Sequence, residues 1–186
     1  MRGSRRARFL ALAAGLLAPL LPLLAHAAAP VATERTERTA PRLEARSLEG
    51  KRVSLEELLT HGPVLIDFWA TWCKPCITSL PSLERLWQAH RAEGLTVVAI
   101  SIDGPRNFAK VRPFARGLGL TFPVVLDEDG SLTRRFEVTG VPTSILIGPD
   151  GRVVRHHVGY TPGQEVELEA AVAQLLHANA AADSAR

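Results

Sequence analysis

The sequence predicts an α/β domain in which a central mixed β-sheet is flanked by helices and preceded by a β-hairpin. Four short apolar runs rich in Val, Ile and Leu alternate with longer stretches of helical periodicity. The near-continuous apolar content of these runs indicates a sheet that is covered on both faces. A turn signal after the fourth run indicates that the last two strands pair antiparallel, which makes the sheet mixed.

The predicted elements follow one another as β-α-β units. A hairpin is expected where the segments 43–48 and 51–53 flank Glu49-Gly50. The four apolar runs, predicted to be strands, lie at 64–70, 95–102, 122–126 and 143–147. Helical spacing of apolar residues occurs at 75–90 and 105–118, so these stretches are predicted to be crossover helices.

The C-terminal part is predicted to form a hairpin and one helix. The turn signal Gly148-Pro149-Asp150-Gly151 joins the run 143–147 to Val153-Val154. The segment 161–164, Thr-Pro-Gly-Gln, is typical of a helix start, because threonine can cap, proline suits the first turn and glutamine can reach back. The helix is expected over 163–177, followed by a disordered tail at 179–186.

The N-terminus has the layout of a secretory signal peptide. Four arginines and no acidic residue precede an apolar stretch at 9–24, which ends before Ala25-His26-Ala27. We expect cleavage after residue 27, which leaves a flexible linker at 28–41 and one domain at 42–178. The stretch is shorter than the ~20 residues of a membrane-spanning helix and contains two prolines. An uncleaved leader would instead anchor the protein in the membrane.

The formal net charge of +3 depends on this leader. Removing the four leader arginines leaves 18 basic and 19 acidic residues, a net charge of −1. A basic surface able to neutralise phosphates has no support in the remaining composition, so no nucleic-acid partner is expected.

The only two cysteines, Cys73 and Cys76, carry the strongest functional signal. Disulfides persist in exported proteins, but a bridge that closes so short a loop adds little loop-closure entropy, so chemistry explains the pair better than stability. Cys73 follows a predicted strand, and Pro75 suits the first turn of a helix, so the Cys73 thiolate is expected at a helix N-terminus that stabilises it. Cys76 lies one turn further in and is expected to be less accessible. Cys73 is therefore predicted to attack and Cys76 to resolve.

The run 67–76, Asp-Phe-Trp-Ala-Thr-Trp-Cys-Lys-Pro-Cys, resembles the active-site segment of thioredoxins, in particular that of the exported TlpA/ResA-like group. Three further features match this family. Asp67 stands where thioredoxins keep a buried acid, and Pro81 stands where they kink the active-site helix. The segment 140–143, Gly-Val-Pro-Thr, resembles their cis-proline loop. The N-terminal hairpin resembles an addition found in the TlpA/ResA-like group, so the resemblance spans about 42–177.

The resemblance implies a thioredoxin fold and a thiol:disulfide oxidoreductase without a cofactor. Cys73 would attack a substrate disulfide, and Cys76 would release the reduced product and leave the Cys73–Cys76 disulfide. Asp67, if buried, would have a raised pKa and could take the proton of Cys76. Trp72 and the Val141-Pro142 segment would bind an extended substrate peptide.

The resemblance also implies partners and a location. The related exported proteins are reductases, some of which maintain the haem-binding cysteines of apocytochromes c. We therefore expect a monomeric protein-disulfide reductase in the periplasm or another extracytoplasmic space, recharged by a membrane thiol-transfer protein. The direction of electron flow stays open because the charge of Lys74 favours a thiolate, whereas a cation opposes the helix dipole at its N-terminus.

Other interpretations of the same residues are possible. A zinc site would need two histidines besides the cysteines, but none is paired like a ligand, so no metal is expected; His156 and His157 are predicted to lie at the surface. A copper-handling protein or a binding module of the same fold would lack cysteine-dependent turnover. Asp67 could be a core acid without a catalytic part. The acidic run 127–130 is predicted to be a solvated turn.

Overall fold

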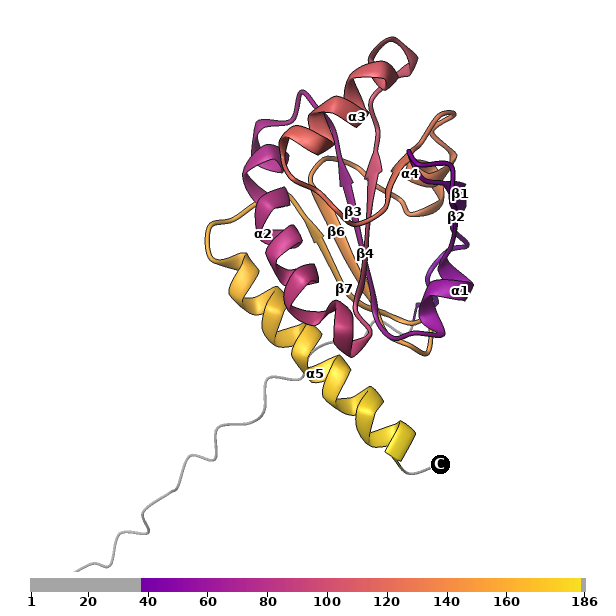
Figure 1. Ribbon diagram of the computed structural model, residues 1–186, viewed down its shortest axis with the longest axis vertical. Coiled ribbons are helices and arrows are strands. Elements are labelled where there is room, and N and C mark those ends of the chain that lie inside the picture. The colour runs from indigo at the N-terminus through magenta and orange to yellow at the C-terminus, as the bar shows by residue number, and fades with distance from the viewer. Residues whose placement is uncertain (1–37, 185–186) are drawn as a thin grey trace, which may run out of the picture. The chain divides into compact units, whose positions relative to one another are not determined.

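Residues 38–184 of the protein are described by the computed structural model. The expected signal peptide at 1–27, most of the expected linker and residues 185–186 lie outside the described residues. At the centre is a five-stranded sheet with the order β5-β4-β3-β6-β7 (Figure 1). None of the helices described is long and apolar enough to cross a membrane.

The sheet is mixed, as predicted, because its two halves run in different directions. Strand β3 pairs in parallel with β4, and β4 with β5, whereas β3, β6 and β7 pair antiparallel. A separate hairpin pairs β1 with β2. The strands are β1 (Glu44–Arg46), β2 (Arg52–Ser54), β3 (Val64–Trp69), β4 (Thr96–Ser101), β5 (Val124–Leu126), β6 (Thr143–Ile147) and β7 (Val153–Val158).

Helices connect the parallel strands because parallel neighbours need a crossover. Helix α2 joins β3 to β4, and α3, preceded by the short helix η2, joins β4 to β5, as predicted. The helices are α1 (Leu55–Leu59), α2 (Lys74–His90), η1 (Arg91–Glu93), η2 (Pro105–Asn107), α3 (Phe108–Gly117), α4 (Ser131–Arg135) and α5 (Gln164–Ser184).

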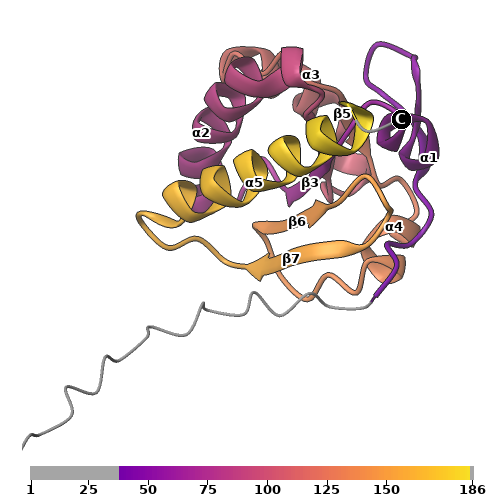
Figure 2. The same cartoon turned by 90° about the horizontal axis from the view of Figure 1, so that it is seen from below.

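The sheet is covered on both faces, which explains the near-continuous apolar content of its strands. On one face Leu65 and Trp69 of β3 pack in a cluster with residues of α2, α3 and α5. On the other face Ile66 and Phe68 pack with the N-terminal hairpin, α1 and α4. Figure 2 shows α2, α3 and α5 together on one side of the strands and α4 on the other. All six residues of β3 are buried, so this strand forms the centre of both clusters.

Two boundaries differ from the sequence prediction. The folded part begins before residue 42, because Thr39 bridges Arg152 and the backbone N–H of Ala40 donates to the Gly151 carbonyl over 2.9 Å. Helix α5 continues to Ser184, although residues beyond 178 were predicted to be a disordered tail. Alanines at 178 and 180–182 favour this extension, since alanine has the highest helix propensity.

The prediction of a solvated turn at 127–130 was wrong for its first residue. Asp127 is only 6% exposed. Its carboxylate accepts hydrogen bonds from the backbone N–H groups of Leu132 and Thr133, at 3.0 and 2.8 Å. Asp127 therefore satisfies free N–H groups at the start of α4, a helix too short for its periodicity to be recognised in the sequence.

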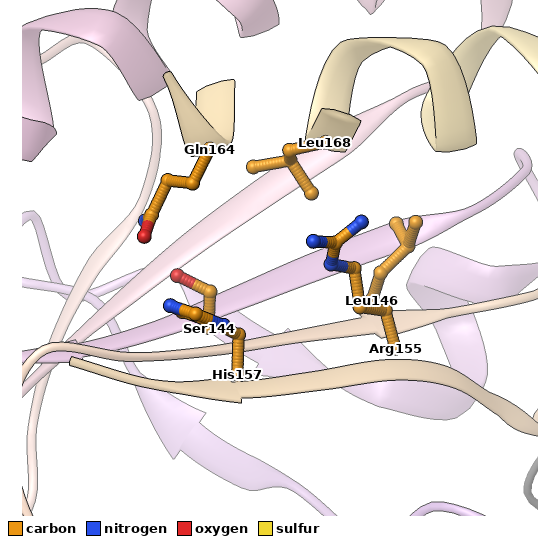
Figure 3. A pocket seen from close by; sticks show the side chains of 6 residues that line it. All are labelled: Ser144, Leu146, Arg155, His157, Gln164 and Leu168. Carbon is orange, nitrogen blue, oxygen red and sulfur yellow. The ribbon is translucent and has the colours of Figure 1, made fainter. Parts of the chain in front are cut away.

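Helix α5 covers the antiparallel half of the sheet and leaves a small pocket against it. Figure 3 shows side chains from β6, β7 and α5 converging there. The lining residues are Ser144, Leu146, Arg155, His157, Gln164 and Leu168.

Candidate active site

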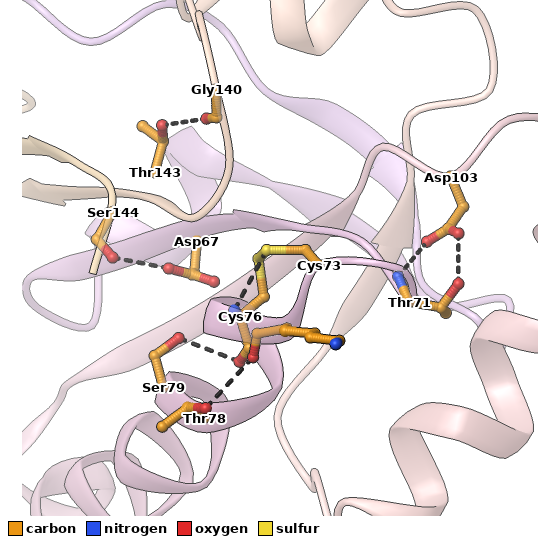
Figure 4. The surroundings of a disulfide bond; sticks show 11 residues. Asp67, Thr71, Cys73, Cys76, Thr78, Ser79, Asp103, Gly140, Thr143 and Ser144 are labelled. Carbon is orange, nitrogen blue, oxygen red and sulfur yellow. Dashed lines mark hydrogen bonds between the residues drawn. A yellow bond between two sulfur atoms is a disulfide. The ribbon is translucent and has the colours of Figure 1, made fainter. Parts of the chain in front are cut away.

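The two cysteines lie at the N-terminus of α2 and form a disulfide (Figure 4). Their Sγ atoms are 2.07 Å apart and their Cα atoms 5.3 Å apart. Cys73 has extended backbone angles and is the N-cap of the helix, and its Sγ accepts a hydrogen bond from the backbone N–H of Cys76 at 3.2 Å. A thiolate at this position would face the N–H groups and the positive end of the helix dipole, which favour negative charge on Cys73.

The exposures of the residues around the disulfide differ strongly. Cys73 is 5% exposed and Cys76 is 0% exposed, while Trp72 is 61% exposed. Cys73 is thus the sulfur nearer to solvent, in the order expected from the sequence. A tryptophan exposed to this extent beside the disulfide offers an apolar surface to an approaching partner.

Asp67 lies on β3 and is completely buried. The hydroxyl group of Ser144 on β6 donates a hydrogen bond to Asp67 Oδ1 over 2.7 Å, while Oδ2 has no partner in the described part of the chain. Burial raises the pKa of Asp67 to about 7, although the Ser144 hydrogen bond lowers it. In Figure 4 the carboxyl group is drawn between the Ser144 hydroxyl and the two sulfur atoms.

The loop before β6 contains the predicted Val141-Pro142 segment. The Val141–Pro142 peptide bond is cis. Pro142 is buried, and Val141 is partly buried against the cluster that includes both cysteines. The Thr143 hydroxyl donates to the Gly140 carbonyl, and the Gly159 N–H donates to the Pro142 carbonyl, at 2.6 and 2.7 Å. The structure therefore packs Val141, next to the cis-proline, against the cluster that includes both cysteines.

A second buried carboxylate, which the sequence analysis missed, holds the segment before Cys73. Asp103 is 1% exposed. It accepts hydrogen bonds from the backbone N–H and the hydroxyl group of Thr71, at 2.9 and 2.6 Å, and from the Ser101 hydroxyl at 2.9 Å. Asp103 follows β4 as Thr71 follows β3, and the carboxyl ends of neighbouring parallel strands meet at one edge. That pattern could have identified this contact from the sequence.

The two neighbouring histidines of β7 lie on opposite faces of the sheet, as the alternation of side chains along a strand requires. His156 is exposed and lines a hollow with Arg38 and Phe136. His157 is only partly exposed, and its Nε2 atom is buried, so the prediction of a surface position was wrong for this residue. The reason is that α5 packs over its side of the strand.

A metal site would require several ligating side chains in one place. Among residues 38–184, no group of three or more His, Cys, Asp or Glu side chains is arranged to hold a metal ion.

The chain matches known proteins in sequence over most of this domain. The model of the AhpC/TSA family matches residues 36–156. Thiol-disulfide oxidoreductase ResA from Bacillus thuringiensis (strain Al Hakam) is 33% identical over 130 residues, which cover 70% of this chain and 73% of that protein. ResA from Bacillus subtilis (strain 168) is 35% identical over 116 residues, 62% of this chain and 63% of that protein.

The fold also matches solved structures. A crystal structure from Chlorobium tepidum, assigned as the thiol:disulfide interchange protein DsbE, superposes with a TM-score of 0.69 and 32% sequence identity. The match covers 75% of this chain and 96% of that chain. The thioredoxin fold predicted from the motif is therefore confirmed, together with the resemblance on which the prediction rested.

The buried Asp67 predicts an unusual dependence of stability on pH. Below about pH 4 the carboxyl group is protonated in both the folded and the unfolded protein. Between pH 4 and 7 only the unfolded chain ionises, because the folded pKa is about 7, so stability falls as the pH rises. Asp67→Asn avoids this loss. Its free energy of unfolding relative to that of wild type should therefore be higher at pH 8 than at pH 4, by on the order of 4 kcal/mol.

Urea unfolding of the oxidised protein at the two pH values measures this difference. Ser79→Ala is a suitable control, because Ser79 is also buried but bonds to the Cys76 carbonyl instead of Asp67. A stability gain of equal size at pH 4 and pH 8 in Asp67→Asn would mean that the Asp67 carboxyl is not protonated preferentially in the folded state.

Proposed function

Because the chain belongs to the AhpC/TSA family and is a ResA-like thiol:disulfide oxidoreductase, we propose that Cys73 and Cys76 are its reacting groups and that it reduces disulfides of exported proteins. The observation that carries this proposal is the disulfide at the N-terminus of α2. There the Cys73 sulfur accepts a hydrogen bond from the backbone N–H of Cys76. The N-terminal sequence, with its basic segment, apolar stretch and Ala-His-Ala site, supports export to an extracytoplasmic space.

The proposed reaction begins with the reduced protein. The Cys73 thiolate attacks a substrate disulfide, forms a mixed disulfide and displaces one substrate thiolate. Cys76 then loses its proton to Asp67 and attacks the Cys73 sulfur, which displaces the second substrate thiolate. Two electrons pass to the substrate, and the Cys73–Cys76 disulfide remains. The lower exposure of Cys76 supports this division of roles, since an incoming protein reaches Cys73 first.

Substrate binding is proposed at the surface next to Cys73. Trp72 offers an exposed apolar ring, and the backbone groups of Val141 form no hydrogen bond to the rest of the described chain, so they are available to an extended peptide. Pro142 shapes this loop.

The electron donor is proposed to be a membrane thiol-transfer protein, and apocytochromes c in cytochrome c maturation are proposed substrates. The protein is proposed to act as a monomer.

Insulin reduction with dithiothreitol as the electron source tests the proposed activity. The wild-type protein should accelerate the reaction, whereas Cys73→Ser should fall to the uncatalysed rate because the attacking thiolate is lost. Cys76→Ser should also lose turnover but should accumulate a mixed disulfide through Cys73, visible by mass spectrometry. Turnover that persists in Cys73→Ser would refute the assignment of the attacking sulfur.

The role of Asp67 as the base is tested with a chromogenic disulfide, 5,5′-dithiobis(2-nitrobenzoate). Attack by Cys73 releases one coloured thiolate and resolution by Cys76 releases the second, so stopped-flow absorbance separates the two steps. Asp67→Asn should leave the first release nearly unchanged and slow the second about 100-fold, a typical contribution of acid–base catalysis. An unchanged second phase would remove Asp67 from the mechanism.

The reduction potential of the Cys73–Cys76 pair tests the direction of electron flow. Equilibration with dithiothreitol or glutathione buffers should give a value near the about −270 mV of thioredoxin if the protein is a reductase. A value near about −120 mV, as in the oxidant DsbA, would contradict the proposed direction while leaving the oxidoreductase activity intact.

A further inference from the structure

Three proton-carrying side chains form a row across the sheet. Asp67 on β3 lies opposite Ser144 on β6, and Ser144 lies opposite His157 on β7. Residues that oppose each other in antiparallel strands point to the same face, with Cβ atoms about 4.5–5.5 Å apart. All three side chains thus lie on the face that α2 and α5 cover.

Exposure to solvent increases along this row. Asp67 is 0% exposed and Ser144 is 9% exposed, while His157 is partly exposed on β7, the last strand of the sheet. The first link is already a hydrogen bond, from the Ser144 hydroxyl to Asp67 Oδ1 at 2.7 Å. At the other end, His157 Nε2 is buried and has no hydrogen-bond partner among the described residues.

The pocket beneath α5 lies at the second link of the row. Ser144, His157 and Gln164, which carry polar side chains, are among the residues that line it, together with Leu146, Arg155 and Leu168 (Figure 3). Its volume of about 10 Å³ is close to the space that one water molecule needs. A water molecule there would have a hydroxyl, an imidazole and an amide as hydrogen-bond partners, which meets the usual requirement of two to four.

We propose that Ser144, one water molecule in this pocket and His157 form a proton path between the buried Asp67 carboxyl group and solvent. The proposal rests on the proposed role of Asp67 as the base for Cys76. That role requires Asp67 to release the proton it has taken before the next cycle, and a completely buried carboxyl group has no direct contact with solvent.

The transfer conserves protons and involves no change of oxidation state. The Asp67 O–H donates its proton to Ser144 Oγ while the Ser144 hydroxyl proton passes to the water molecule. The water molecule in turn gives a proton to the neutral His157 ring at Nε2. The imidazolium then loses its Nδ1 proton to solvent, and the Ser144 hydroxyl, which now carries the Asp67 proton, donates to the Asp67 carboxylate as in the structure. Before the next release the Ser144 hydroxyl turns toward the water molecule, and the imidazole exchanges its Nε2 proton for one at Nδ1. The same steps in reverse deliver a proton when the disulfide is reduced.

Charged side chains from β7 and α5 lie around His157. Arg155 lies two residues earlier on the same face of β7, but it forms an ion pair with Glu167 of α5. Glu167 also interacts with the His157 ring. The positive charge of Arg155 is therefore balanced by a carboxylate that faces the same imidazole. On the opposite face of β7, His156 interacts more weakly with His157 than with Arg38, so it serves as a matched control.

The proton exchange of Asp67 can be measured directly in the oxidised protein. Light-induced release of caged protons at pH 8 starts protonation of the ionised carboxylate, and time-resolved infrared spectroscopy follows its carboxylic C=O band. The band is assigned by its absence in Asp67→Asn. His157→Gln should slow this protonation about tenfold, because Gln cannot carry the proton, and added imidazole should restore part of the rate. His156→Gln should match wild type.

Ser144 variants test the first link independently. Ser144→Ala should slow protonation of Asp67, whereas Ser144→Thr, which keeps a hydroxyl group, should remain near the wild-type rate. Thermal unfolding of each variant confirms that it is folded. Equal protonation rates in wild type, His157→Gln and Ser144→Ala would overturn the proposed path.

The path and the proposed function can fail separately. If Asp67 is not the base, the second thiolate release is unchanged in Asp67→Asn, whatever the infrared rates. If the path is wrong but Asp67 is the base, the release slows in Asp67→Asn while the infrared rates of the Ser144 and His157 variants equal that of wild type.

Discussion

Burial of the Asp67 carboxyl group on the central strand is the constraint on which the rest of the site depends. Strand β3 has neighbours on both sides and clusters on both faces, so this side chain has no surface exposed to bulk solvent. Ionisation in such a place is costly unless hydrogen bonds compensate, and Ser144 supplies only one. The pKa of about 7 that results leaves Asp67 able to take or give a proton near neutral pH.

The strand directions bring the other parts of the site to the same place. Strands β3 and β4 are parallel, so the segments that follow them meet, and Asp103 after β4 holds Thr71 just before Cys73. Strand β6 is antiparallel to β3, so the loop before β6, with Pro142, lies near the end of β3 where α2 begins. The disulfide is thus framed by segments that lie far apart in the chain.

Short sequence motifs predicted several parts of this site well, because each of these parts is formed by residues close together in the sequence. The cysteine pair, the start of α2 and the proline loop could be identified because their residue types and spacing carry the information. Ser144 could not be identified as the partner of Asp67, because that contact requires the register of β3 against β6. His157 was misplaced for a similar reason: strand alternation separates it from His156, but only the packing of α5 shows which face is covered.

The same distinction applies to the fold. Long elements with a clear period, such as α2 and β3, were predicted within a residue or so of their bounds. Helix α4 has only five residues and was missed, and Asp127 before it was taken for a solvated acid. Its burial follows from the N–H groups of Leu132 and Thr133, which need an acceptor. The charge of an acidic residue therefore did not show whether its carboxylate is solvated or buried. The backbone N–H groups at the start of the following helix, which need an acceptor, do show it.

A buried acid also constrains the protein whichever way electrons flow. Closing the Cys73–Cys76 disulfide removes a proton from Cys76, and opening it returns one, so a base beneath the pair must exchange protons with solvent in both directions. The proposed path along Ser144 and His157 leads from the central strand to β7, the last strand of the sheet. Such an arrangement would give the buried acid a route for proton exchange that does not pass through the sulfur atoms.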